Sequence, residues 1–179
     1  LTFYDDNHLF YITSAGISLL NISTSESRLL YSNTTEDFFQ VPSLYYDDQL
    51  KRLWMGTGSA GLFYYDIIRK SLSDIPIRNF PKQPILAIRK DAKNTLLIGI
   101  DGQGIWNISE KGDTILHIYK EDLNNPFSLR GDGVYDILCD GSKNWIATFT
   151  GKLSFFENSN SQITPVSYTH LRAHETVLD

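Results

Sequence analysis

Cysteine is almost absent from this sequence of 179 residues, and Cys139 is the only one. A single thiol excludes an internal disulfide framework and any metal site built from several thiolates. Because Cys139 lies in the apolar run that begins at Val134, we expect it to serve as a small buried apolar residue. The chain begins with Leu1 inside a strand-like pattern, as expected of a piece of a longer protein.

An excess of positive charge is also lacking. Lys and Arg number 16 against 21 Asp and Glu, for a net charge of −5. Nucleic-acid binding normally needs clustered basic residues, so no nucleic acid is expected as a partner. The sequence has neither a secretion signal nor an apolar run long enough to span a bilayer, so no membrane contact by this segment is expected.

Helical periodicity is missing as well. No stretch shows a sustained apolar period of 3.6 residues, which predicts a domain nearly free of helices. Aromatic residues make up 13% of the chain, with ten Tyr and ten Phe, and such residues favour strands.

What the sequence does contain is a fourfold repeat. In each copy an apolar strand ends in a small residue, passes through a loop and continues as a second apolar strand. The copies are Phe10–Thr13, Trp54–Thr57, Leu97–Ile100 and Trp145–Thr148. Their last residues lie 44, 43 and 48 positions apart. This period predicts β-propeller blades, because four short strands with their turns occupy about 40 to 45 residues.

We therefore predict an all-β fold, a partial β-propeller of about four four-stranded antiparallel blades. The predicted blades cover residues 1–40 (incomplete at its start), 41–83, 84–132 and 133–165 (incomplete at its end). Each blade has an acidic residue after its innermost strand, where Asx turns favour it; these are Asp5 or Asp6, Asp47 or Asp48, Asp91 and Asp140.

Several repeated residues have a structural explanation. Blades are closest near their inner strands, which accounts for small residues at Gly56, Gly99 and Ala147. Gly61 and Gly104 lie where the chain leaves a tight turn, and glycine there permits positive φ or a close backbone approach. Large rings are predicted to pack between blades, with sugar stacking as the alternative; they are Trp54, Trp106, Trp145, Phe63, Phe155 and Phe156.

These repeats carry a family resemblance. The segment from Asp47 to Asp66, with Trp54-Met55-Gly56-Thr57 near its middle, resembles the two-component regulator propeller repeat. The segment from Tyr119 to Arg130, with Asn124-Asn125-Pro126, is similar to the link between blades in bacterial hybrid sensor histidine kinases. It departs from that link at Leu123, where the family has Pro. The resemblance covers residues 1 to about 165.

The resemblance implies a ligand-sensing, non-catalytic fragment of the periplasmic sensor region of such a kinase, an inner-membrane protein that regulates transcription. Many members detect oligosaccharides, so an oligosaccharide is the implied ligand. Further implied partners are the remaining blades of a propeller of about seven blades, the downstream sensor domains and a second copy of the parent in a homodimer. A protein-interaction propeller without a small ligand is the alternative, although the Gly-His and Trp-Asp signatures of WD40 repeats are missing.

Motifs of enzymes are lacking. The sequence has no Gly-x-Ser-x-Gly elbow and no phosphate-binding loop. A glycosidase needs two convergent carboxylates, yet among the loops between second and third strands only Asp101 is acidic. We expect no catalytic activity and no cofactor.

The expected ligand-binding face is formed by those loops together with the links between blades, since irregular segments on a rigid scaffold carry recognition. The longest link, residues 121–133, is expected to place its polar side chains beside the loop of the preceding blade. The predicted ligand-binding residues are Asp101, Gln103, Asn124, Asn125, Arg130 and Asp132.

Residues 166–179 break the repeat. Ser167–Thr176 resembles a translated sequencing adapter, so this stretch is expected to be a non-native tail. His170 and His174 are four residues apart, but no second metal-binding element accompanies them, and no metal site is predicted. Four blades out of about seven would leave two apolar faces unprotected, so the isolated chain is expected to aggregate or to unfold with low cooperativity.

Overall fold

The computed structural model describes residues 1–32, 40–150 and 153–166. These residues form sixteen strands in four antiparallel sheets of four strands, and they contain no helix. In each sheet the strands follow one another in chain order. The predicted all-β fold of four four-stranded blades is confirmed. The adapter-like tail with His170 and His174 lies outside the described residues.

The blades are numbered 1 to 4 in chain order. Blade 1 contains β1 (Thr2–Asp5), β2 (His8–Thr13), β3 (Gly16–Asn21) and β4 (Ser27–Ser32). Blade 2 contains β5 (Ser43–Asp47), β6 (Arg52–Gly56), β7 (Leu62–Asp66) and β8 (Ser71–Asp74). Blade 3 contains β9 (Ile85–Lys90), β10 (Leu96–Ile100), β11 (Gly104–Ile108) and β12 (Ile115–Tyr119). Blade 4 contains β13 (Val134–Asp140), β14 (Lys143–Thr148), β15 (Leu153–Glu157) and β16 (Asn160–Pro165).

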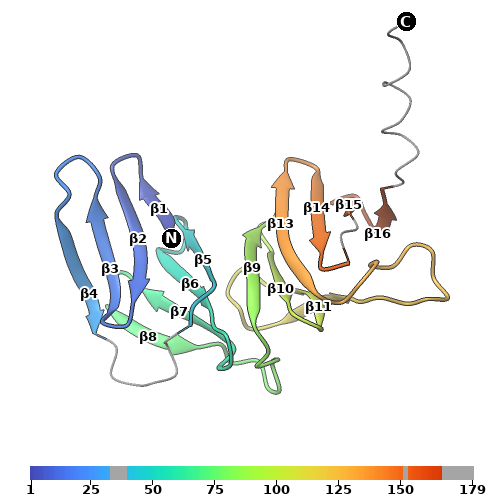
Figure 1. Cartoon of the computed structure of the whole chain (residues 1–179), viewed down its shortest axis with the longest axis horizontal. Coiled ribbons are helices and arrows are strands. Elements are labelled where there is room, and N and C mark those ends of the chain that lie inside the picture. Colours follow the sequence, from blue (N-terminus) through green and yellow to red (C-terminus); the bar gives the residue numbers. More distant parts are fainter. Residues whose placement is uncertain (33–39, 151–152, 167–179) are drawn as a thin grey trace, which may run out of the picture.

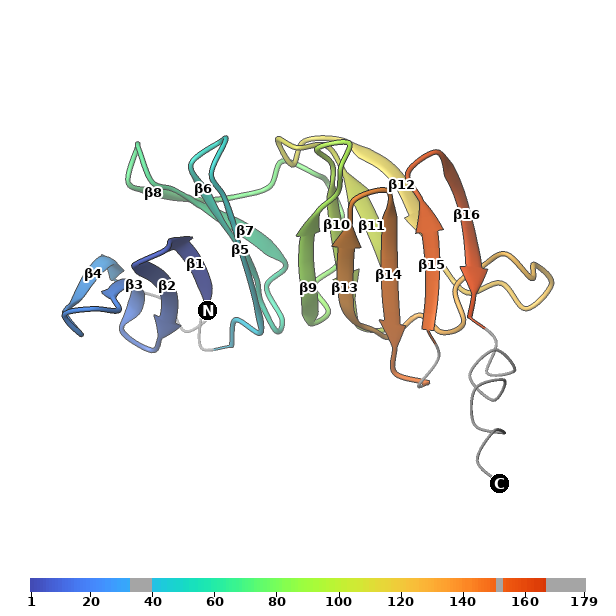
Figure 2. The same cartoon turned by 90° about the horizontal axis from the view of Figure 1, so that it is seen from above.

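The four blades form an open arc, with blade 1 at one end and blade 4 at the other (Figures 1 and 2). The first strand of each blade is innermost, so that β1 packs against β5, β5 against β9 and β9 against β13. An apolar core fills each of these three contacts. Phe10, Trp54 and Leu97 open three of the repeated motifs, and each is buried in the core between its own blade and the next.

Glycines in the second strands allow consecutive blades to approach closely. A Cβ atom at Gly56 would overlap Ser43 of the same blade and Ile85 of the next. A Cβ atom at Gly99 would lie 2.8 Å from Cγ1 of Val134 in blade 4. Close-packed interiors have no room for an added carbon, so both positions require glycine in this arrangement.

Two other glycines serve the backbone. The φ angles of Gly61 and Gly104 are 97° and 72°, a region that residues with a Cβ atom rarely adopt. At Gly104 a Cβ atom would also overlap the carbonyl oxygen of Tyr119. Both glycines allow the chain to leave the loop and enter the third strand.

An Asx turn closes the first hairpin in three of the four blades. In each, a carboxylate oxygen accepts a hydrogen bond from the backbone N–H two residues later. The three residues are Asp5, Asp47 and Asp91, with distances of 2.8, 3.0 and 3.0 Å. The predicted role of the repeated Asp is confirmed in these blades, and the structure selects Asp5 and Asp47 over Asp6 and Asp48.

The large rings divide into two groups. Trp54 and Trp106 lie in the core between blades 2 and 3, and Phe156 lies in the core between blades 3 and 4. Trp145 and Phe155 pair in register on the opposite face of blade 4 from Phe156, because neighbouring residues of a strand point to opposite faces. For these two rings, packing between blades of this chain is not observed.

Replacement of Gly56 by Ala is expected to lower the free energy of unfolding by about 1–3 kcal/mol, because overpacking forces neighbouring groups to move. Urea unfolding followed by tryptophan fluorescence measures this change. Gly58→Ala is the matched control, since the nearest atoms to a Cβ there, Oε1 and Cβ of Gln40, would lie 3.0 and 3.2 Å away and not in overlap. An unchanged stability of the Gly56→Ala variant would contradict the role of close approach.

Candidate functional site

Loops lie at both ends of the blades. The link rim is defined as the end that carries the loops between second and third strands together with the links 75–84 and 120–133. The turn rim is the opposite end, which carries the Asx turns. The predicted ligand-binding residues belong to the link rim, on blade 3 and on the link that follows it (Figure 1).

Gln103 and Asp132 are brought together by hydrogen bonds. The backbone N–H of Gly104 donates to the carbonyl oxygen of Asp132 at 2.8 Å. Lys120 donates from Nζ to Oε1 of Gln103 at 3.1 Å, and the N–H of Glu121 donates to Oδ1 of Asp132 at 2.7 Å. The loop of blade 3 is therefore joined to both ends of the link.

Asp101 lies beside the same contact. Its backbone N–H donates to the carbonyl oxygen of Pro84 at 2.9 Å, and its Oδ1 atom lies 3.3 Å from the position that a Cβ atom on Gly133 would occupy. The residue is exposed. Asp101 thus lies beside Gly133, the residue after Asp132, and Gln103 is bonded to Lys120. Asp101, Gln103, Asp132 and Lys120 are together called the polar cluster of the link rim.

Asn124, Asn125 and Arg130 make hydrogen bonds within the link itself. Oδ1 of Asn125 accepts a hydrogen bond from the N–H of Phe127 at 3.0 Å, and Arg130 donates from Nη2 to the carbonyl oxygen of Pro126 at 3.0 Å. Asn125 also lines a pocket of about 350 Å³ between this segment and the outer strands β12 and β16. Figure 2 shows the link extending beyond β16. The side-chain hydrogen bonds of Asn125 and Arg130 thus stay within the link, whereas those of Lys120 and Glu121 connect Gln103 and Asp132.

The link folds back on itself around Ser128. The hydroxyl of Ser128 accepts from the N–H of Asp122 at 3.0 Å and lies 2.9 Å from the carbonyl oxygens of Asp122 and Asn125. Leu129 is buried in the core between blades 3 and 4. The Asn-Asn-Pro segment is thereby a compact turn pointing outward.

Sequence reasoning missed a cavity of about 430 Å³ between blades 1 and 2. It is lined by Tyr4, His8, Phe10, Leu19, Arg28, Leu29, Leu30, Tyr65, Ile67 and Lys70. The hydroxyl of Tyr65 donates to the carbonyl oxygen of Leu30 at 3.2 Å across it. Its residues come from five strands and a turn, so no local motif could have revealed it.

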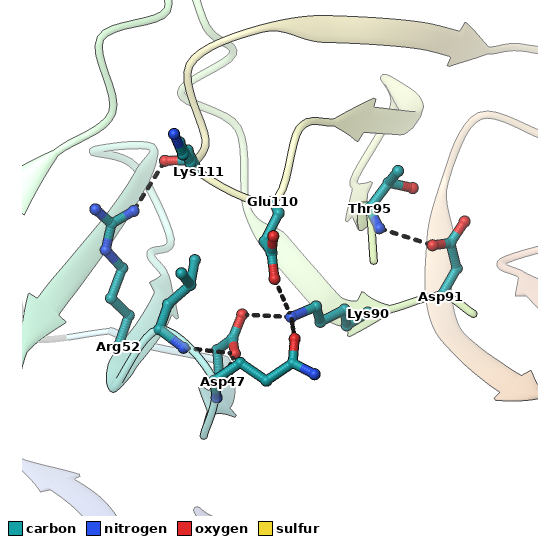
Figure 3. A network of polar contacts seen from close by, with 9 residues as sticks. Asp47, Arg52, Lys90, Asp91, Thr95, Glu110 and Lys111 are labelled. Carbon is teal, nitrogen blue, oxygen red and sulfur yellow. Dashed lines mark hydrogen bonds and ion pairs between the residues drawn. The ribbon is translucent and has the colours of Figure 1, made fainter. Parts of the chain in front are cut away.

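The most buried charged cluster lies on the turn rim and joins blades 2 and 3 (Figure 3). Lys90 donates from Nζ to Asp47, Gln49 and Glu110 at 3.0, 2.9 and 2.6 Å. The Lys90 and Asp47 side chains are only 8% and 2% exposed. Nearby, Arg52 donates to the carbonyl oxygen of Lys111 in blade 3 at 3.0 Å. Because all three N–H groups of the ammonium have acceptors, the cluster is structural.

The contribution of this cluster to the stability of the fold depends on pH, because the ion pair requires a charged Lys90. Burial by itself would lower the pKa of Lys90, but the hydrogen bonds and charges of Glu110 and Asp47 outweigh burial and raise it above its ordinary value. A raised pKa means that the ion pair stabilises the fold fully below the ordinary value of about 10.4. This contribution is lost as the pH rises through the raised pKa.

Lys90→Met is expected to lower the free energy of unfolding by about 3–5 kcal/mol at pH 7, because it leaves the buried Asp47 carboxylate without its cation. Lys93→Met, in the exposed turn of the same blade, is the control and is expected to have little effect. Urea unfolding at pH 7 and at increasing alkaline pH measures both variants. A Lys90→Met difference that does not shrink at the highest pH would contradict the ion-pair explanation.

Cys139 is half-buried against the core between blades 3 and 4. It is therefore less buried than the sequence predicted. Burial, followed by the negative charge of Asp91, raises the pKa of its thiol to about 11. Since the thiolate is the reactive form, this thiol is protected from oxidants and electrophiles.

Ellman's reagent is expected to react with Cys139 at pH 8 at least tenfold more slowly in the folded chain than in urea. With a pKa of about 11 the thiolate fraction at pH 8 is about 0.1%, against about a quarter for a free cysteine. Equal rates in the two states would show that the folded environment does not protect the thiol.

Within the residues that the structure describes, no group of three or more His, Cys, Asp or Glu side chains is placed to hold a metal ion. In the same residues there is no helix with the length and apolar character needed to cross a membrane.

No protein-family model matches this sequence, and no curated protein matches it. Solved structures do. The extracellular domain of the one-component system BT4673 from B. thetaiotaomicron superposes with a TM-score of 0.69 at 22% identity, over 85% of this chain. That of the hybrid two-component system BT3049 from the same organism gives a TM-score of 0.69 at 20% identity, over 92% of this chain.

The chain is a four-blade arc of a β-propeller. It spans about a fifth of the length of each bacterial domain, 20% and 21%. The computationally designed protein Ika4 is also similar, with a TM-score of 0.62 at 13% identity over 86% of this chain and 87% of Ika4. At these identities the likeness concerns the fold.

Proposed function

We propose that the chain is a ligand-sensing, non-catalytic propeller segment of the periplasmic sensor region of a bacterial hybrid two-component histidine kinase. The likeness of its fold to the extracellular domains of BT4673 and BT3049 carries this proposal, because it extends over 85% and 92% of the chain. Through the parent kinase, ligand occupancy would regulate transcription.

The link between blades 3 and 4 supports the same proposal independently. Its Asn124-Asn125-Pro126 and Ser128-Leu129 sequences resemble the link of the sensor kinase family. In the structure Ser128 closes the outward turn and Leu129 anchors it in a core. The residues that carry the resemblance are therefore the ones that shape the link.

The proposed ligand is an oligosaccharide bound at the cluster of Asp101, Gln103 and Asp132. A sugar hydroxyl both donates and accepts hydrogen bonds. In this cluster the two carboxylates accept hydrogen bonds, the Lys120 ammonium donates them and the Gln103 amide can do both. The cluster lies on loops held by a rigid sheet, the usual arrangement for recognition.

The same cluster suggests how occupancy would be transmitted. Gln103 belongs to blade 3 and Asp132 to the link that leads into blade 4. A ligand that bridges them would favour one arrangement of blades 3 and 4 over another. The free energy by which the ligand shifts this equilibrium is limited by the difference between its binding free energies for the two arrangements.

The test begins with calorimetric titration of the purified chain and of the parent receptor against a panel of oligosaccharides. For a sugar that binds, Asp101→Ala is expected to weaken affinity about tenfold or more, since a hydrogen bond to a charged group contributes about 1.5–3 kcal/mol. Asp48→Ala removes an exposed carboxylate from the turn rim and is expected to leave affinity unchanged.

The outcomes separate the proposal from its alternatives. A sugar that binds equally well to the Asp101→Ala variant would move the site elsewhere, with the cavity between blades 1 and 2 as the next place to examine. If no sugar binds to the parent receptor and a protein partner does, the segment is an interaction scaffold instead.

A further inference from the structure

The cavity between blades 1 and 2 lies where large side chains fill the equivalent contact between blades 2 and 3. In blade 2 the paired residues Trp54 and Tyr64 pack with their ring centres 5.2 Å apart. Arg52 covers them, 4.3 Å from the ring centre of Tyr64. Trp54 is 0% exposed, and a Cβ atom at Gly112, in the turn between β11 and β12, would lie 2.6 Å from its ring. The two rings therefore fill the contact as far as the turn of blade 3.

Blade 1 has smaller side chains at the same register positions. Phe10 and Leu19 pair across β2 and β3 where blade 2 has its two rings, and His8 takes the position of the blade 2 arginine. Because these side chains are smaller, the cavity of about 430 Å³ remains between them and Ile67 and Lys70 of blade 2. Its size lies within the range of about 300–1,000 Å³ that is typical of small-molecule sites.

The wall of this cavity is mostly aromatic and aliphatic. The rings of Tyr4 and Phe10 meet edge to face with their centres 5.3 Å apart, and Tyr65 lines the cavity from blade 2. The hydroxyl of Tyr65 already donates to the carbonyl oxygen of Leu30. A flat apolar body fits such a wall, because aromatic rings favour edge-to-face and offset contacts with another ring.

Two cations border the same cavity. Arg28 continues the cross-strand row of Phe10 and Leu19, and Lys70 lies in the turn between β7 and β8. The described residues that line the cavity include no carboxylate. Among the residues that the structure describes, neither the Arg28 guanidinium nor the Lys70 ammonium has an ion-pair or hydrogen-bond partner. Both charges are therefore available to an anion.

The other ionisable groups around the cavity have partners within blade 1. Nδ1 of His8 lies 2.9 Å from Oδ1 of Asp5, and Nε2 of His8 accepts a hydrogen bond from Asn21 at 3.2 Å. With both ring nitrogens engaged, His8 contributes a wall to the cavity. Glu26 lines the neighbouring hollow and accepts a hydrogen bond from the hydroxyl of Thr24 at 3.3 Å.

We propose that this cavity is a second ligand site, on the turn rim, that binds a small aromatic carboxylate. The ring of the ligand lies against Tyr4 and Phe10, and its carboxylate meets Arg28 and Lys70. A guanidinium suits this role because its parallel N–H groups match the two oxygens of a carboxylate. Two consecutive blades of this chain form the site, and the proposal does not depend on the oligosaccharide site of the opposite rim.

Calorimetric titration of the parent receptor and of the full 179-residue chain with 1-naphthoate tests the proposal. The neutral amide of the same shape, 1-naphthamide, is the matched ligand. 1-Naphthoate is expected to bind with a Kd of about 1 mM or below. It is expected to bind about threefold or more tightly than the amide, because ion pairs near solvent contribute modestly. Added salt is expected to reduce this preference by screening the charges.

Two variants separate the apolar wall from the charges. Leu19→Tyr gives blade 1 the residue type that fills the contact in blade 2, and it is expected to weaken 1-naphthoate binding about tenfold or more by occupying the cavity. The double variant Arg28→Gln, Lys70→Gln is expected to lower the affinity for 1-naphthoate to that for the amide. Arg69→Gln is the control, since Arg69 is 78% exposed in the same turn as Lys70 and does not line the cavity.

The Arg69→Gln variant is expected to keep the affinity of the unchanged chain. Circular dichroism of each variant shows whether its sheets are retained, and the double variant changes only exposed residues, so it tests the site even if Leu19→Tyr does not fold. Equal affinities for the acid and the amide, or unchanged binding of the acid to the double variant, would overturn the proposal. So would binding of glucuronate, an acid without an aromatic ring, in place of 1-naphthoate.

Discussion

The structure depends on the close approach of consecutive blades beside their inner strands. At Gly56 and Gly99 the next blade comes so near that no Cβ atom fits, with Ile85 and Val134 occupying the space. Such an approach brings the flanking faces into contact over their whole width, and Trp54 and Leu97 are fully buried as a result. A sheet of four short strands has no core of its own, so each blade obtains its stability from these contacts.

Polar groups reinforce the contact between blades 2 and 3 at both rims. On the turn rim, Lys90 of blade 3 is held by the buried Asp47 of blade 2. On the link rim, the N–H of Ile85 donates to the carbonyl oxygen of Thr57 at 3.1 Å, and the hydroxyl of Ser43 donates to that of Ile85 at 2.6 Å. Each group is buried and paired, which makes the centre of the arc the most constrained part of the molecule.

At the ends of the arc, apolar residues on the outer faces are exposed. Leu138 lies on blade 4 and Phe3 on blade 1. The proposed ligand cluster lies at the link leading into blade 4, where the N–H of Gly104 donates to the carbonyl oxygen of Asp132 and the N–H of Phe149 donates to that of Gly133.

The local pattern of the sequence was sufficient for the blades. The strand and turn residues recur with a period near that of a blade, and the Asx turns at Asp47 and Asp91 are formed by the residue and its two successors alone. The same is true of the positive φ angles at Gly61 and Gly104, because backbone sterics act over neighbouring residues.

The candidate site was only half predictable, because its geometry depends on contacts between distant segments. The sequence by itself determined an arc of four antiparallel blades and a polar link rim. The tertiary structure decided that the loop of Gln103 is bonded to the link through Lys120 and Asp132, and that Asn125 lies beside the outer strands, since Ser128 folds the link back. It also decided that Trp145 faces outward and that Lys90 joins two blades, because burial of a side chain depends on which blade covers it.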